Sequence, residues 1–332
     1  MSDVLVTGGT GYLATRLIAD LLLEGAAVRT TVRSPERADE VRAAVRGAGA
    51  DDAGLRFVVA SLTSDDGWAE AARDVEEVHH VASPMIQTTD PDEVVAPARD
   101  GALRALRAAR DAGARRVVLT SSFAAVGYSP KPVRDYDETD WTEPDTPGLP
   151  AYPRSKAVAE RAAWDFVERE GGGLELVALN PTWIAGPTLV AEARSSLQLF
   201  VGMLDGTMRT VPKQRFGIAD VRDVAQAHLA AMRTPEAAGR RYLLLADGPT
   251  TTFAGVAEVL RTRLGDLAAR VDVAEAPGDE PAPLVIRNDR AKAELGFLPR
   301  PVETTIVETA TSLRDLGMLA AGRPGAPGSI GA

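Results

Sequence analysis

The chain has 332 residues, of which 45% are hydrophobic and 25% are charged, and its formal net charge at pH 7 is -10. These values are typical of a folded globular protein with room for about two domains, and the acidic balance argues against a nucleic-acid-binding protein. The chain has no cysteine, which excludes disulfides, thiolate nucleophiles and cysteine-ligated metals, and its three histidines lack the spacing of a metal site.

No basic leader with an apolar segment precedes the first predicted strand, and no apolar run approaches the roughly 18 residues of a membrane span. We therefore expect a cytoplasmic protein without a membrane or nucleic-acid partner, either a monomer or a homodimer.

Short β-branched runs alternate with longer amphipathic segments over the first half of the chain. This alternation predicts a parallel sheet with helices on both faces, which is a doubly wound α/β, or Rossmann, domain. The six predicted strands comprise residues 4–6, 28–32, 57–59, 78–81, 117–119 and 174–179. Two predicted helices carry apolar stripes, one at Leu13, Leu17, Ile18, Leu21 and Leu22, the other at Val158, Ala162, Phe166 and Val167.

Beyond residue 181 the prolines punctuate shorter elements, which predicts a smaller, discontinuous α/β region that binds the substrate. A helical pattern after Asp220 and a strand at residues 242–246 predict one return to the first domain. We assign residues 1–184 and 212–247 to the Rossmann domain, residues 185–211 and 248–318 to the substrate-binding region, and residues 319–332 to a flexible tail.

The run Thr7-Gly8-Gly9-Thr10-Gly11-Tyr12-Leu13 lies between the first predicted strand and the first predicted helix. Glycines let the backbone turn tightly and approach a pyrophosphate, while the free amides and the positive end of the next helix attract its charge. A glycine-rich turn alone is weak evidence, but between a strand and a helix it predicts a dinucleotide site.

The second predicted strand ends in the run Val32-Arg33-Ser34-Pro35-Glu36-Arg37. A carboxylate at this place would bind the ribose hydroxyls of NAD, whereas an arginine accommodates the extra phosphate of NADP. Arg33 and Arg37 therefore predict NADPH/NADP+ as the cofactor. The competing interpretation is a solvated arginine pair in an arginine-rich chain.

The fifth predicted strand ends in Thr120-Ser121-Ser122, at the sheet edge where α/β proteins bind ligands, although serines there can equally be strand-end caps. Tyr152 and Lys156 follow one helical turn apart, in a chain with only four lysines. A phenol ordinarily releases its proton near pH 10, and a neighbouring ammonium group favours the phenolate. The spacing favours Tyr152 as a proton donor to a carbonyl. The competing interpretation is a Tyr and a Lys that merely lie on the surface of a helix.

The chain resembles the extended short-chain dehydrogenase/reductases over nearly its whole length, to about Leu316. The motifs that carry this resemblance are Thr7-Gly8-x-x-Gly11, Ser121-Ser122, Tyr152-x-x-Ser155-Lys156, Asn180-Pro181-Thr182 with Gly186-Pro187, and Asp220-Val221-x-Asp223-Val224-Ala225. Within that family it is most similar to the dihydroflavonol reductase, cinnamoyl-CoA reductase and aldehyde/ketone reductase branch. The motifs for the branch are Val32-Arg33-Ser34, Asp65-Asp66-Gly67-Trp68, His80-Val81-Ala82-Ser83-Pro84 and Asn288-Asp289-x-x-Lys292-x-x-Leu295-Gly296-Phe297.

The resemblance implies an NADP-dependent oxidoreductase in which Ser122 polarises the carbonyl, Tyr152 is the general acid, and Lys156 supports Tyr152 and holds the nicotinamide ribose. Ser121 stays open as the alternative serine. Tyr152 and Lys156 also belong to the implied cofactor contacts, and the others are Thr7, Gly8, Thr10, Gly11, Tyr12, Leu13, Arg33, Arg37, Ser61, Leu62, Val81, Ala82, Ser83, Thr120, Ser121, Pro181, Thr182 and Ile184. The chain departs from the family pattern at Ser61, where an aspartate commonly contacts the adenine; the backbone amide of Leu62 can still do so.

The leading functional interpretation is reversible reduction of an aldehyde or ketone by NADPH. An NAD-dependent nucleotide-sugar epimerase or dehydratase shares the fold and the Ser, Tyr and Lys set, but it usually has an acidic residue where Arg33 stands. A non-catalytic NADP-sensing protein would not need Tyr152 with Lys156. Six apolar or aromatic residues indicate an apolar or aryl carbonyl substrate, although they can equally be core: Phe123, Tyr128, Trp183, Leu199, Met203 and Phe216.

Overall fold

The computed structural model describes residues 3–84, 91–192 and 196–319 of the chain. At its centre lies a seven-stranded parallel sheet with the strand order β12-β7-β5-β4-β1-β2-β3, so the predicted doubly wound α/β class is confirmed. The strand order reverses between β1 and β4, which opens the ligand crevice of such sheets. The strands are β1 (Asp3–Val6), β2 (Val28–Val32), β3 (Leu55–Val59), β4 (Val75–His80), β5 (Arg116–Thr120), β7 (Glu175–Pro181) and β12 (Arg241–Leu244).

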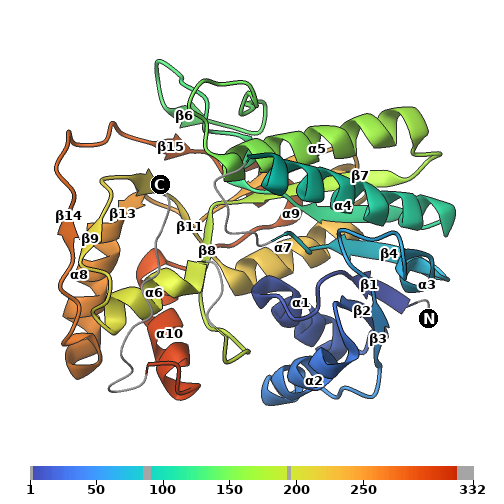
Figure 1. Ribbon diagram of the computed structural model, residues 1–332, viewed down its shortest axis with the longest axis horizontal. Coiled ribbons are helices and arrows are strands. Elements are labelled where there is room, and N and C mark those ends of the chain that lie inside the picture. The colour runs from blue at the N-terminus through green and yellow to red at the C-terminus, as the bar shows by residue number, and fades with distance from the viewer. Residues whose placement is uncertain (1–2, 85–90, 193–195, 320–332) are drawn as a thin grey trace.

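Helices cover both faces of this sheet, because its strands are apolar on both sides. One layer contains α1 (Tyr12–Leu23), α2 (Ala38–Gly47) and α7 (Val221–Arg233), and the other contains α3 (Trp68–Ala72), α4 (Pro91–Asp111) and α5 (Ala151–Glu170). Figure 1 shows the two layers on opposite sides of the strands. The predicted stripe of α1 is buried, since Leu13, Leu17, Ile18, Leu21 and Leu22 all belong to the core.

A second hydrophobic core lies among α6 (Ser196–Leu204), α8 (Phe253–Leu264) and α10 (Val302–Asp315), which Figure 1 shows together beside the main sheet. Short strand pairs lie outside the main sheet. They are β8 (Trp183–Ala185) with β11 (Ile218–Asp220), β9 (Thr210–Val211) with β14 (Ala274–Glu275), β10 (Arg215–Phe216) with β13 (Thr251–Thr252), and β6 (Asp135–Tyr136) with β15 (Val285–Ile286). The remaining helices are α9 (Asp289–Leu295) and the 3-10 turns Pro35–Arg37, Phe123–Ala125, Pro235–Ala237 and Gly265–Ala268.

The chain returns to the main sheet at β12, which pairs with β7. The exact division between the two predicted regions stays a prediction, because β8 follows β7 directly and pairs with β11, which begins 33 residues after β8 ends. Residues 320–332 of the predicted tail lie outside the described residues. Within the ranges that the structure describes, none of the helices has both the length and the apolar character that crossing a membrane requires.

The buried face of α5 differs from the predicted one. Val158 and Ala162 are only half-buried, whereas the face turned inward contains Ala157, Glu160 and Ala163. The rest of the predicted stripe holds, because Phe166 is buried and Val167 packs against the same core. The prediction was wrong for Val158 and Ala162, since it counted apolar residues alone and missed the buried carboxylate of Glu160.

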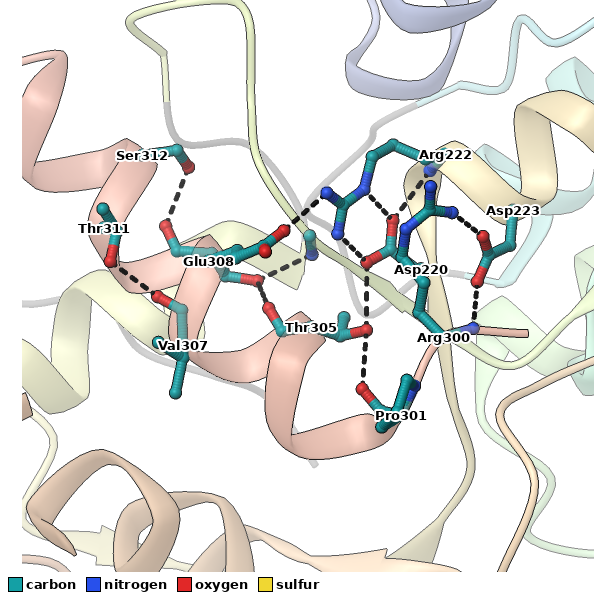
Figure 2. A network of polar contacts seen from close by, with 12 residues as sticks. Asp220, Arg222, Asp223, Arg300, Pro301, Thr305, Val307, Glu308, Thr311 and Ser312 are labelled. Atoms are coloured by element: carbon teal, nitrogen blue, oxygen red, sulfur yellow. Dashed lines mark hydrogen bonds and ion pairs between the residues drawn. The ribbon is translucent and has the colours of Figure 1, made fainter. Parts of the chain in front are cut away.

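A polar network fastens α10 to the start of α7 (Figure 2). Asp220 caps α7 by accepting a hydrogen bond from the backbone amide of Arg222 at 2.9 Å, and its carboxylate also pairs with the Arg222 guanidinium. Thr305, on α10, donates its hydroxyl to Asp220 at 2.9 Å. Burial opposes ionisation of Asp220, but the hydrogen bonds from Arg222 outweigh it, so the pKa of this carboxyl is lowered. Arg300, just before α10, also donates its backbone amide to the buried carboxylate of Asp223 on α7 at 2.7 Å. Two buried carboxylates of the sheet domain, Asp220 and Asp223, therefore hold the second core in place.

Candidate active site

The turn after β1 requires glycine at two positions. Gly8 has a φ of +75°, and a Cβ there would lie 3.0 Å from the Cβ of Ala82. A Cβ on Gly9 would lie 2.4 Å from the hydroxyl oxygen of Thr30, which is closer than such atoms approach. The turn therefore has no side chain at these two positions, which lets a pyrophosphate approach its backbone closely.

Thr7 holds the ends of β1 and β4 together at the switch point of the sheet. Its hydroxyl oxygen accepts hydrogen bonds from the backbone amides of Val81 and Ala82, each at 3.0 Å, and lies 2.9 Å from Nδ1 of His80. Thr7 is fully buried, so its role in this structure is to shape the crevice.

Helix α1 begins at Tyr12 with amides that no side chain caps. Gly11 occupies the N-cap position without a side-chain hydrogen bond, and the first turn of the helix has no acidic residue. The N-terminus of a helix in this state attracts an anion. The residues present therefore fit the pyrophosphate of a dinucleotide, with the amides of Tyr12 and Leu13 at the helix end.

The two arginines after β2 differ in their surroundings. Arg33 is exposed, and within the described part of the chain its guanidinium has no ion-pair partner. Arg37 forms ion pairs with Glu40 at 2.7 Å and with Glu192 at 3.1 Å. Arg33 is thus ready to bind a phosphate, whereas Arg37 would first have to leave two carboxylates.

The loop after β3 is held by its own neighbours. The indole nitrogen of Trp68 donates to the carbonyl oxygen of Ser61 at 2.9 Å, and Arg104 donates to the carbonyl oxygen of Leu62 at 2.8 Å. Gly67, with a φ of +80°, passes so close to Val59 that a Cβ would lie 1.9 Å from its carbonyl oxygen. The Asp65-Asp66-Gly67-Trp68 motif thereby fixes the position of the Leu62 amide.

The predicted Ser, Tyr and Lys set comes together at the carboxyl ends of β4 and β5. Ser122 and Tyr152 line one cleft of about 840 Å³, and Tyr152 is 53% exposed. Tyr152 lies in the first turn of α5, and Nζ of Lys156 lies 5.8 Å from the centre of its ring. The same Nζ donates to the hydroxyl of Ser83 at 3.1 Å.

The geometry favours Ser122 over Ser121 as the serine that contacts a ligand. Ser121 is buried, and its hydroxyl donates to the carboxylate of Glu160 at 2.5 Å. Ser122 lines the cleft, and its hydroxyl oxygen accepts from the amide of Ala124 at 3.1 Å. Since that bond uses Ser122 as an acceptor, its hydroxyl proton is free to be donated to a carbonyl.

The other predicted contacts occupy different depths. Thr182 lines the cleft, while Ile184 packs against the core of the sheet domain. Pro181 ends β7, and the hydroxyl of Thr120 lies 2.9 Å from Nε2 of His228, which draws it toward the interior.

Five of the six candidate pocket residues line the cleft: Phe123, Tyr128, Trp183, Leu199 and Phe216. Met203 does not, because it is fully buried in the core between α6, α8 and α10. Met203 follows the lining residue Leu199 by one helical turn, and this spacing alone does not show whether its side chain points to the cleft or to the core.

Sequence reasoning missed a buried cluster directly behind Ser122. The Glu160 carboxylate accepts from Nε of Arg241 at 2.6 Å and from the side-chain amide of Asn180 at 2.7 Å. The same amide donates to the backbone carbonyl oxygen of Ser122 at 3.1 Å, so the cluster links Ser122 to α5. The sequence offers one signal, a Glu one helical turn after Lys156, which is weak by itself.

Known proteins are similar to this chain over most of its length. A profile of the NAD dependent epimerase/dehydratase family matches residues 4–244. Cinnamoyl-CoA reductase 1 of Petunia hybrida is 34% identical over 323 residues, which cover 95% of this chain and 93% of that relative. Ketoreductase azaE of Aspergillus niger is 31% identical over 334 residues, covering 93% of this chain and 97% of that relative.

Among solved structures, yeast methylglyoxal/isovaleraldehyde reductase Gre2 complexed with NADPH is similar, with a TM-score of 0.82 at 27% identity, over 96% of this chain and all 100% of that chain. The predicted resemblance is thereby confirmed, and the chain belongs to the NAD dependent epimerase/dehydratase family of extended short-chain dehydrogenase/reductases.

Proposed function

We propose that this protein is an NADPH-dependent carbonyl reductase that reduces an aldehyde or a ketone and, in reverse, oxidises the alcohol. The observation that carries the proposal is the shared cleft of Ser122 and Tyr152, with Lys156 one helical turn beyond Tyr152. A hydroxyl donor and a phenol on one cleft wall are what a carbonyl oxygen needs as it gains negative charge.

In this mechanism the glycine turn and Arg33 would hold NADPH, which would supply the hydride. Ser122 donates its hydroxyl proton in a hydrogen bond to the carbonyl oxygen and so orients the substrate. Tyr152 delivers its own proton to that oxygen as the carbon is reduced, and the charge of Lys156 stabilises the phenolate that Tyr152 becomes. Lys156 is held in place by Ser83 at the end of β4.

The preference for NADPH rests on Arg33 and on similarity. The guanidinium of Arg33 is exposed at the end of β2, where a 2′-phosphate would lie. The yeast reductase to which the chain is similar was solved with NADPH. These two observations favour NADPH over NADH.

Two alternatives are weighed against this proposal. The matching family is named for NAD dependent epimerases and dehydratases, which use the same fold. Arg33 and the aromatic lining of the cleft favour a reductase over a nucleotide-sugar enzyme. An NADP-sensing protein without turnover would have no use for Tyr152 at the cleft.

The experiment is to follow NADPH oxidation by absorbance against aryl and aliphatic aldehydes and ketones, with NADH in parallel. We expect NADPH to be consumed with at least one class and NADH to be used less efficiently. Tight NADPH binding with no carbonyl reduced would favour the sensor, and conversion of a nucleotide sugar would favour the epimerase.

A further inference from the structure

The cleft that holds Ser122 and Tyr152 has basic side chains in its wall that the proposed reaction does not use. They are Lys131, Arg134 and Arg215. Among the described residues that line the cleft, none is an aspartate or a glutamate, in a chain with 47 acidic and 37 basic residues. A basic cleft in an acidic molecule concentrates anionic ligands.

Arg134 and Arg215 are held in place but not neutralised. Arg134 donates from Nη1 to the carbonyl oxygen of Ala282 at 3.3 Å, and Arg215 donates from Nη1 to that of Thr250 at 3.2 Å. Neither arginine forms an ion pair with any residue that the structure describes, and Nε of Arg215 is buried without a partner. Lys131 differs, because it is bound to the carboxylate of Asp140 at 2.7 Å.

The two guanidinium groups are anchored on segments that are joined to each other. The hydroxyl of Thr250, next to the anchor of Arg215, donates to the carbonyl oxygen of Leu284 at 2.8 Å, close to the anchor of Arg134. Arg215 comes from β10 and Arg134 from the residue before β6, and both line the cleft. Two guanidinium groups with unused donors suit a carboxylate, which accepts paired hydrogen bonds from arginine.

Other groups near these arginines are accounted for. Glu280, whose charge interacts with Arg215, is paired with Lys213 at 2.6 Å. Burial raises the pKa of Tyr128, the charge of Tyr152 raises it further, and a hydrogen bond with Gln214 and the charge of Arg134 oppose the rise. Tyr128 thus interacts with both Arg134 and Tyr152, which connects the basic wall to the reaction centre.

Aromatic side chains lie beside the same wall. The rings of Trp183 and Phe216 are 4.9 Å apart at 78°, and those of Phe216 and Phe253 are 4.7 Å apart. All three line the cleft, and Phe216 follows Arg215 directly. An apolar or aryl body would contact these rings while an anionic group reaches the arginines.

We propose that Arg134 and Arg215 form a carboxylate-binding subsite, and that the substrate is an oxo acid with an apolar or aryl body. The proposal rests on the proposed function, since Ser122 and Tyr152 would hold the carbonyl of the same molecule. Atoms balance as in any carbonyl reduction: hydride goes to the carbon, the Tyr152 proton goes to the oxygen, and the carboxylate is unchanged.

The test compares acids with their neutral esters. kcat/KM is measured with NADPH for benzoylformate, benzoylpropionate and their methyl esters in the wild type, Arg134→Gln and Arg215→Gln. We expect the wild type to prefer one of the acids by about tenfold or more, and each variant to reduce the acid-to-ester ratio by about tenfold. Arg215→Lys should give an acid-to-ester ratio between those of the wild type and Arg215→Gln, because lysine keeps the positive charge but lacks the paired donors of a guanidinium group. The control is Arg209→Gln, an exposed arginine paired with Asp272, which should leave the ratio unchanged.

A second readout needs no turnover. With NADP+ present, phenylacetate should raise the thermal unfolding midpoint of the wild type more than phenylacetamide does, and the difference should vanish in Arg215→Gln. Equal rates for acid and ester in a wild type that reduces both would overturn the subsite while leaving the reductase intact. If no carbonyl is reduced, the proposed function fails, and the subsite is then decided by the binding readout: a carboxylate preference that depends on the arginines supports it, and equal effects of acid and amide overturn it.

Discussion

Tyr152 is exposed over about half its surface although it stands in the first turn of a well-packed helix. Its hydroxyl is therefore available to a ligand in the cleft. Ser121, one residue from Ser122, shows the opposite arrangement, because its hydroxyl is bound to Glu160 in the interior. Under the proposed mechanism, Ser122 would contact the substrate while its neighbour Ser121 belongs to the buried scaffold.

Replacing Tyr152 by Phe should lower kcat by at least about a hundredfold, because the phenol supplies the proton that the product alcohol needs. The measurement is NADPH oxidation at saturating carbonyl substrate. Tyr242→Phe is the matched control, since it removes a phenol that donates to Glu294 at 2.7 Å, outside the residues that line the cleft. A Tyr152→Phe enzyme that keeps most of its turnover would contradict the assignment.

Arg33→Ala should raise the KM for NADPH by at least about tenfold and leave the KM for NADH nearly unchanged, because only NADPH carries the phosphate. Arg37→Ala should have a smaller effect, since this guanidinium is paired with Glu40 and Glu192. Arg56→Ala, which removes an exposed arginine from β3, is the control. Equal changes for both cofactors would refute a phosphate site at Arg33.

At the residue scale, the sequence predicts those site residues that occur in a fixed local pattern. The bare turn at Gly8 and the spacing of Tyr152 and Lys156 are such patterns, and the structure places them at one crevice. Arg215 and Arg241 could not be distinguished in an arginine-rich chain. What separates them is whether a carboxylate faces each guanidinium in the folded protein, and that depends on segments far away in sequence.

Helix α5 carries both the proposed proton donor and the buried carboxylate that supports Ser122. Glu160 lies one turn beyond Lys156 and accepts hydrogen bonds from Ser121, Asn180 and Arg241. One helix thereby sets the relative positions of the strand end after β5 and the first turn of α5. This arrangement explains why the inward face of α5 is partly polar.

Glu160→Gln should destabilise the protein by about 3 to 5 kcal/mol, because it leaves the Arg241 guanidinium buried without a counter-charge. Urea unfolding measures this loss. The double variant Glu160→Gln/Arg241→Gln should recover part of it, since both charges are then absent. For comparison, Arg209→Gln breaks an ion pair between side chains that are 62% and 87% exposed and should cost less than about 1 kcal/mol. If Glu160→Gln and Arg209→Gln lowered the free energy of unfolding by similar amounts, burial of the ion pair would not matter to stability.

Thr305→Val should destabilise the attachment of α10 by about 1 to 3 kcal/mol, because it removes the hydroxyl that donates to the buried Asp220 (Figure 2). Thr311→Val is a matched control in the same helix, where the hydroxyl donates only to the carbonyl oxygen of Val307 one turn earlier. The difference between the two variants in urea unfolding isolates the contact with Asp220. No difference would show that the contact adds nothing to stability.

At the scale of elements, the strands of the main sheet could be predicted because each is a short β-branched run between turn signals. The two-residue strands could not. Pairs such as β10 with β13 form because distant segments meet, and their sequences do not contain this information. Arg215 and Phe216 of the cleft wall lie on such a segment, which is why the charge of Arg215 was not foreseen.

The whole molecule buries its three histidines in the neutral form. Burial lowers the pKa of His79 to about 3, with a further effect from Arg233. It lowers the pKa of His80 to about 4, with a further effect from Lys156. His228, 3.3 Å from His79, also has a pKa well below its usual range, because of burial and then of His79.

Stability should therefore fall as the pH falls below about 6.5. The unfolded chain binds protons at its histidines near that pH, whereas in the folded protein the pKa of His79 is about 3, that of His80 is about 4, and that of His228 lies well below its usual range. The stabilisation is fully present above about pH 6.5, and each histidine removes up to about 1.4 kcal/mol per pH unit below it.

The measurement is the free energy of unfolding in urea at pH 7.5, 6.5 and 5.5. His228→Gln should reduce the pH slope by removing one titrating group. The same free energy at all three values would show that the histidines do not stay neutral on folding.

The order of strands in the sheet has a consequence for biosynthesis. β7 lies between β5 and β12, yet residues 182–240 are translated before β12 appears. Until then β7 is an edge strand whose free backbone groups can pair with another nascent chain. Glu160 meanwhile lacks Arg241, the first residue of β12, so the growing sheet holds an unmatched carboxylate at that place. When β12 arrives, it pairs with β7 and supplies the missing charge in one step. We therefore expect the interval before it to be a stage that favours misassembly.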